Sequence, residues 1–232
     1  MQRVLVTGAN RGIGLEFARQ LLNRGARVIA ACRDPGKALK LTALAAAHPG
    51  HLTVLPLDLT KERSIAELAR QTGAATDALD LLINNAGMLV GGERYGELVA
   101  KTINETFDVN VVGPLLLSQA LTPLLARGES AKIVNLSSDL GSLARTTSFY
   151  TPSYAISKAA LNMVTRLLAA ELAPAGISVI SVSPGWVKTD MGGAQAPVTP
   201  AASVIGLLSI ITGLQRRDSG RFFDHAGAAL PW

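Results

Sequence analysis

Short apolar runs alternate with stretches of helical spacing along the whole chain, and this alternation constrains the fold more than any other feature. An apolar run, an amphipathic helix and a second apolar run form the pattern of a βαβ unit with parallel strands. We expect strands at 3–6, 27–32, 52–57, 79–83, 132–136, 177–182 and 222–223. The expected helices are 12–23, 37–47, 62–71, 99–126 with an interruption near 113–114, 153–172 and 201–214.

The composition agrees with a sheet that is covered on both faces. Of the 232 residues, 48% are hydrophobic but only 4% are aromatic, so the core must be mostly aliphatic. An aliphatic core is what a parallel sheet between two helical layers requires. No repeat or low-complexity linker breaks the pattern. The sequence therefore predicts one α/β domain, residues 1–232, with a doubly wound, mostly parallel seven-stranded sheet and helices on both faces.

Charge, cysteine and histidine content exclude several classes of function. The net charge of +5 is spread along the chain, which argues against a nucleic-acid partner. Cys32 is the only cysteine, so no intramolecular disulfide forms. His48, His51 and His225 lie far apart without acids or cysteines at ligand spacing, so we expect no metal site. Without an expected signal peptide or membrane span, we expect a cytoplasmic protein.

The segment after the first expected strand, Thr7 to Gly14, is rich in glycine. Glycines let the backbone turn tightly, and the N-terminus of the following helix offers free N–H groups to a phosphate. The spacing Gly-x-x-x-Gly-x-Gly differs from the Gly-x-Gly-x-x-Gly fingerprint. An ordinary strand-to-helix turn is the alternative, but the context favours nucleotide binding. The candidate contacts are Gly8, Asn10, Arg11, Gly12, Ile13 and Gly14.

The end of the second expected strand predicts which nucleotide is bound. A dinucleotide site usually has an acid here for the ribose hydroxyls. This chain has Cys32 followed by Arg33. Arginine pairs with a 2′-phosphate, and Arg11 in the glycine segment adds a second positive charge. The alternative is two solvated surface arginines; we favour NADP over NAD.

Polar and small residues also follow the later strands, where ligands bind to a parallel sheet. Asp58 is expected either to hydrogen-bond an adenine amino group or to serve only as a helix N-terminal acid. The Asn-Asn-Ala-Gly and Pro-Gly-Trp-Val-Lys-Thr segments, taken singly, are also consistent with plain turns. The candidate cofactor contacts from these loops are Asp58, Leu59, Asn84, Asn85, Ala86, Gly87, Pro184, Gly185, Val187 and Thr189.

Tyr154 and Lys158 lie four residues apart in an expected helix, so their side chains point the same way. An adjacent ammonium favours tyrosinate and is expected to lower the tyrosine pKa from its usual value of about 10. Such a pair exchanges protons with a carbonyl or alcohol oxygen. Many helices carry Tyr-x-x-x-Lys by chance, so the pair gains meaning only from the motifs around it.

Taken together and in this order, the motifs resemble the short-chain dehydrogenase/reductase family, over essentially the whole chain. The residues that carry the resemblance are Thr7-Gly-x-x-x-Gly-x-Gly14, Asp58, Asn84-Asn-Ala-Gly87, Asn110, Ser138, Tyr154-x-x-x-Lys158 and Pro184-Gly185. Cys32-Arg33, the segment after Gly185 and the ending at Trp232 resemble the branch of sniffer-like carbonyl reductases and C-factor.

The resemblance implies a Rossmann fold and an NADP(H)-dependent oxidoreductase that acts on a small carbonyl or alcohol. It implies a catalytic tetrad of Asn110, Ser138, Tyr154 and Lys158, of which Asn110, Tyr154 and Lys158 also contact the cofactor. Tyr154 would be the proton donor in reduction, Lys158 would bind the nicotinamide ribose, and Ser138 would hydrogen-bond the substrate oxygen. Asn110 would hold a water that links Lys158 to solvent. A homodimer or homotetramer is also implied.

Two questions stay open at this level. Ser138 and Tyr154 are 16 positions apart, more than is usual in the family, because of an insertion within 139–151. Either this loop bulges and reshapes the pocket, or Ser137 or Ser142 takes the role of the serine; we favour Ser138, which ends the strand. The second question is function, because a C-factor-like signalling protein that binds NADP with little turnover is the alternative to an enzyme.

Overall fold

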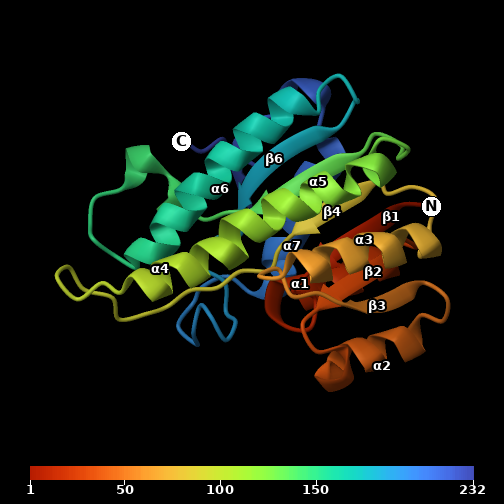
Figure 1. The fold of residues 1–232 in the computed structure, drawn as a ribbon, viewed down its shortest axis with the longest axis horizontal. Helices are drawn as coiled ribbons and strands as arrows, with labels where there is room; N and C mark the ends of the chain where they lie inside the picture. The colour runs from red at the N-terminus through yellow and green to blue at the C-terminus, as the bar shows by residue number, and fades with distance from the viewer.

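The seven expected strands form one sheet. The computed structural model describes all residues from 1 to 232. The strands lie in the order β3-β2-β1-β4-β5-β6-β7, and every neighbouring pair is parallel (Figure 1). Their bounds are β1 Arg3–Thr7, β2 Arg27–Cys32, β3 Leu52–Pro56, β4 Leu81–Asn84, β5 Lys132–Leu136, β6 Ser178–Ser183 and β7 Phe222–Asp224. The predicted α/β sheet is confirmed, and it is entirely rather than mostly parallel.

The connections run outward from the centre of the sheet in both directions. The chain builds β1, β2 and β3 to one side and then returns to place β4 on the other side of β1. In such sheets ligands bind at the carboxyl ends of the strands on either side of this reversal. The connecting helices are α1 Gly12–Asn23, α2 Leu39–Ala47, α3 Glu62–Ala75, α4 Ala100–Phe107, α5 Gly113–Leu125, α6 Pro152–Glu171 and α7 Pro200–Gly213.

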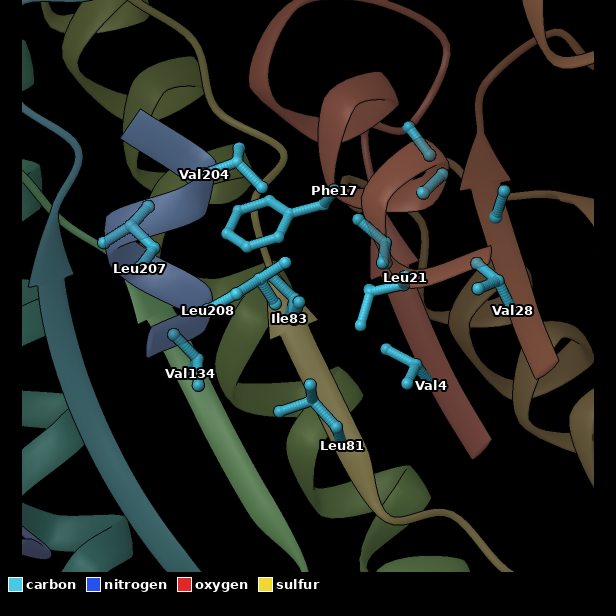
Figure 2. Packing of buried hydrophobic residues seen from close by; sticks show 14 of the residues in the cluster. Val4, Phe17, Leu21, Val28, Leu81, Ile83, Val134, Val204, Leu207 and Leu208 are labelled. Atoms are coloured by element: carbon cyan, nitrogen blue, oxygen red, sulfur yellow. The ribbon is translucent and has the colours of Figure 1, made fainter. Parts of the chain in front are cut away.

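Two aliphatic cores sandwich the sheet, because alternate strand residues point to opposite faces. On one face Val4 and Ile83 pack with Phe17 of α1 and Leu207 of α7 (Figure 2). On the other face strand residues such as Leu5 pack against α3, α5 and α6. Figure 1 shows these three helices together on one side of the sheet. Both faces are therefore covered, as the aliphatic composition predicted.

The long helix expected at 99–126 is interrupted by a π-helical turn at Asp108–Val112, just before the expected position near 113–114, and this turn joins α4 to α5. The residue after this turn is Gly113. A larger residue does not fit there, because its Cβ would lie 2.6 Å from the Cβ of Leu59. The combined stretch Ala100–Leu125 is long and apolar enough to cross a membrane by length and composition alone. Half of its most apolar 18-residue window is buried within the fold, where α5 contributes to the core on its face of the sheet.

Candidate active site

The glycine segment after β1 is locked to the turn after β4. Gly8 and Gly12 have positive φ angles of +64° and +54°, which favour glycine. A Cβ on Gly8 would lie 2.9 Å from Cα of Ala86. The Asn85 side chain donates a hydrogen bond of 2.7 Å to the carbonyl of Thr7. These contacts bring two of the predicted cofactor-binding segments together and hold the backbone of the turn in place.

The N-terminus of α1 is open to an anion. Arg11, the residue before the helix, is extended and makes no side-chain cap, so the first N–H groups of α1 have no side-chain partner. The Arg11 guanidinium forms an exposed ion pair of 2.8 Å with Asp190. A Cβ on Gly12 would lie 3.3 Å from Cγ2 of Thr189. The loop after β6 therefore lies against the glycine segment, as a shared binding site requires.

The loops after β2 and β3 carry the residues expected at the ribose and the adenine. Arg33 is exposed directly after β2, and the adjacent Asp34 is paired with Lys37 at 3.0 Å. Asp58 accepts hydrogen bonds of 3.1 Å and 2.7 Å from the N–H and hydroxyl of Thr60. Partial burial opposes ionisation, but the hydrogen bonds from Thr60 and Lys61 lower the pKa of Asp58. Thr60 precedes α3, which has no side-chain cap, so these bonds close a local turn and both alternatives for Asp58 stay predictions.

Asn84 occupies a different position from the other expected cofactor contacts. Its side chain is buried and donates hydrogen bonds of 3.2 Å to Ser118 and 2.8 Å to Asn135. Asn135 in turn donates to Thr165 at 2.8 Å. The Asn84 amide thus belongs to a buried polar network that ties β4 and β5 to α5 and α6.

Tyr154 and Lys158 lie on one face of α6, so the predicted juxtaposition is present. The Lys158 Nζ atom is 5.4 Å from the centroid of the Tyr154 ring. It donates a hydrogen bond of 2.7 Å to the carbonyl of Leu136 at the end of β5. Lys158 is only 3% exposed. The Leu136 carbonyl is therefore the partner of an ammonium group that solvent barely reaches.

The pKa values of this pair correct one expectation from the sequence. Desolvation raises the pKa of Tyr154 to about 12, against the hydrogen bond from Ser138, and the charge of Asp139 raises it further. Desolvation lowers the pKa of Lys158 to about 8. The expectation that the lysine lowers the tyrosine pKa is wrong for this structure, because burial dominates the shift and Lys158 is not among its causes. The phenol is therefore protonated at neutral pH and suited to donate a proton.

Only one of the three candidate serines has its hydroxyl beside Tyr154. The Ser138 side chain lies close enough to the phenol to lower its pKa, and it accepts a bond of 3.2 Å from the Leu140 N–H. The hydroxyl of Ser137 donates to the carbonyl of Lys158 at 3.3 Å. Ser142 is fully buried and donates to the carbonyl of Pro231 at 2.7 Å. This arrangement favours Ser138 over both alternatives.

Gly141 and Ser142 of the insertion before Tyr154 pack inward, whereas residues 143–150 are all exposed, so most of this loop bulges from the fold. Its 3₁₀ turns, Asp139–Gly141 and Leu143–Arg145, follow Ser138 directly. A Cβ on Gly141 would lie 2.7 Å from the carbonyl carbon of Lys158, and Asn162 donates to the Gly141 carbonyl at 3.1 Å. This contact has no signal in the sequence, because a lone glycine in such a loop predicts only a turn.

Asn110 connects the loop after β4 to the catalytic helix. From the π-helical turn, its amide accepts a hydrogen bond from the Met88 N–H and donates one to the Met88 carbonyl, both 2.8 Å long. It also donates to Ser157 at 3.0 Å. A Cβ on Gly87 would lie 3.4 Å from Asn110 Oδ1 and 3.6 Å from Lys158 Nζ. The four residues of the predicted tetrad therefore surround one point at the carboxyl edge of the sheet.

Known proteins share both the sequence pattern and the architecture. The family described as short chain dehydrogenase matches residues 2–198. The C-signal protein of Myxococcus xanthus is 40% identical over 161 residues, which are 69% of this chain and 97% of that protein. A 1-hydroxy-2-glutathionyl-2-methyl-3-butene dehydrogenase of a Rhodococcus species is 36% identical over 236 residues, which cover all of both chains.

The solved structures of two carbonyl reductases superimpose along the whole chain. The NADPH-bound carbonyl reductase from chicken fatty liver has a TM-score of 0.95 and 39% identity, and covers 100% of this chain and 99% of its own. The carbonyl reductase Sniffer of D. melanogaster has a TM-score of 0.95 and 33% identity, with 100% of both chains covered. On its sequence, its sheet and the arrangement of its Tyr-x-x-x-Lys helix, the chain belongs to the short-chain dehydrogenase/reductase family of oxidoreductases.

Proposed function

We propose that the chain is an NADPH-dependent carbonyl reductase, which interconverts a small ketone or aldehyde and its alcohol. The observation that carries the proposal is Tyr154, a protonated phenol that lies beside Ser138 and next to the buried ammonium of Lys158. The direct test follows the absorbance of NADPH with a panel of aromatic and aliphatic carbonyl compounds. Failure to oxidise NADPH with every member of the panel contradicts the proposal.

The chain fits this cofactor. The open N-terminus of α1 and the glycines around it would hold the pyrophosphate, and Arg33 with Arg11 would face the 2′-phosphate. Two similar solved structures are described as bound to NADPH or NADP. When bound, the cofactor supplies the hydride.

The residues of this chain would then control the proton and the developing charge. Tyr154 donates its phenolic proton to the substrate oxygen, and Ser138 hydrogen-bonds the same oxygen as negative charge develops there. The ammonium of Lys158, held by the Leu136 carbonyl, stabilises the tyrosinate that remains. Asn110 holds the loop after β4 against α6 and so keeps this side of the site in place.

Replacing Arg33 with alanine is expected to raise the KM for NADPH about 10- to 100-fold. This range corresponds to the binding free energy lost with one or two charge-assisted hydrogen bonds. The KM for NADH should change little, because NADH has no 2′-phosphate. The matched control is Arg24→Ala, at the other end of α1, which should leave both constants unchanged. Equal effects of Arg33→Ala on the two cofactors would contradict the assignment of Arg33 to the 2′-phosphate.

The pH dependence should follow the lowered pKa of Lys158. Below a pH of about 8 the ammonium is charged, and above it the charge that stabilises the tyrosinate is lost. We therefore expect kcat/KM for NADPH in the reduction direction, which reports the free enzyme, to be level at neutral pH and to fall as pH rises through this value. A profile that stays level to pH 10 would show that the charge of Lys158 is not required.

A second candidate function is signalling through cofactor occupancy. The similarity to the C-signal protein motivates it. Tight NADPH binding without turnover on any carbonyl compound would favour this alternative, whereas turnover that depends on Tyr154 would favour the enzyme.

We further propose a homodimer or homotetramer in the cytoplasm. Ile156, Met163 and Leu167 of α6 are each more than half exposed, so the helix offers apolar surface to a second copy. Light scattering of the purified protein tests the oligomeric state, and a monomer at all concentrations contradicts it.

A further inference from the structure

The helix that carries Tyr154 begins without a cap of its own. Thr151, the residue before α6, has a φ of +41° and makes no side-chain cap, and its buried hydroxyl has no partner. A left-handed conformation is strained for a β-branched residue. The first N–H groups of any helix need partners from outside the helix. In α6 one such partner comes from a distant part of the chain.

Glu93, sixty residues earlier, supplies this cap. Its carboxylate accepts a hydrogen bond of 3.2 Å from the Ser153 N–H and a second bond from the Ser153 hydroxyl. Ser153 is fully buried and immediately precedes Tyr154. A carboxylate at a helix N-terminus also interacts favourably with the helix dipole. The start of the catalytic helix is thus held by a group from the loop after β4.

The same two bonds anchor that loop, which lies beside the start of α6 in Figure 1. These two bonds are the only hydrogen bonds that link residues 89–98 to the rest of the chain. The Glu97 N–H donates to the Arg94 carbonyl, but that bond lies within the loop. Tyr95 adds an edge-to-face contact with Phe149 of the insertion, with ring centroids 5.5 Å apart. The loop after β4 therefore contacts both segments that lead into Tyr154: the insertion through Tyr95 and the first turn of α6 through Glu93.

We propose that Glu93 is a positioning residue for the reduction: it caps α6 from the loop after β4 and so sets the place of the Tyr154 phenol. The inference rests on the proposed role of Tyr154 as proton donor. Misplacement of a catalytic group by about 1 Å is enough to cost on the order of 10²-fold in rate. Loss of the cap should therefore appear in kcat and leave the distant glycine segment unaffected.

The test compares Glu93→Ala with Glu93→Gln and with Glu97→Ala, an acid in the same loop whose side chain makes no hydrogen bond or ion pair. We expect Glu93→Ala to lower kcat about 10-fold or more while the Kd for NADPH stays near that of the unaltered protein. Glu93→Gln, which keeps an acceptor oxygen, should recover much of this loss. Glu97→Ala should have no effect.

Amide hydrogen exchange without cofactor supplies a readout that does not depend on turnover. Glu93→Ala should speed exchange in residues 89–98 and in the first turn of α6 only. If Glu93→Ala left both exchange and kcat unchanged, the positioning role would be overturned. Faster exchange throughout the chain together with weaker NADPH binding would overturn it as well. Full turnover in Tyr154→Phe would overturn the proposed function and the positioning role with it, whereas local exchange in Glu93→Ala would still establish the cap.

Discussion

Replacing Tyr154 with phenylalanine will lower kcat for carbonyl reduction by about 10²- to 10⁴-fold, the usual contribution of a general acid. The substitution removes only the phenolic oxygen, and the half-buried ring beside Lys158 stays. We therefore expect the variant to fold normally and to bind NADPH with nearly unchanged affinity. Steady-state rates, together with a titration of NADPH fluorescence, separate the loss of the proton donor from a loss of cofactor.

The chain contains a matched control for this variant. Tyr150 lies four residues earlier and is 62% exposed, so Tyr150→Phe should leave kcat nearly unchanged. If Tyr154→Phe retained a rate close to that of Tyr150→Phe, the phenol of Tyr154 would not be the proton donor.

Replacing Lys158 with methionine should lower kcat about 10²-fold or more and at the same time stabilise the protein without cofactor. A pKa lowered from 10.5 to about 8 means that burial of the charged amine costs about 3 kcal/mol at neutral pH. Methionine removes this cost but leaves the Leu136 carbonyl without its donor, which costs about 1 kcal/mol. The net gain in the free energy of unfolding is expected to be about 1–2 kcal/mol at pH 7.

This gain must disappear at high pH. Below about pH 8 the lysine is protonated in both the folded and the unfolded chain, so the full cost is present. Between pH 8 and 10.5 only the unfolded chain keeps the proton, and the stability of the unaltered protein rises with pH through this window. Urea unfolding at pH 7 and pH 10 measures the difference. Lys40→Met, on the exposed side of α2, is the control, and a Lys158→Met variant less stable at pH 7 contradicts the argument.

Much of the site followed from the sequence because the ends of parallel strands meet at one edge of a sheet. Once the apolar runs are assigned to parallel strands, the segments at Gly8, Asn85, Ser138 and Gly185 must lie close together. Helical spacing places Tyr154 and Lys158 on the same side of α6 with no further information. These inferences depend on local periodicity and on connection rules, both of which can be read from the order of residues.

Other properties of the site depend on which distant segments pack together. The buried position of the Asn84 amide arises from contacts with residues 34 and 51 positions away. The choice of Ser138 over Ser142 depends on the contact between Ser142 and Pro231, 89 positions later. No spacing rule connects such residues, so the sequence left these choices open.

The sequence by itself determined the parallel sheet, the edge at which its loops converge and the pairing of Tyr154 with Lys158. The tertiary structure alone decided the protonation of that pair, because desolvation depends on how tightly the surrounding segments exclude water. It also decided how the catalytic helix begins, because the carboxylate that caps Ser153 comes from Glu93, sixty residues away.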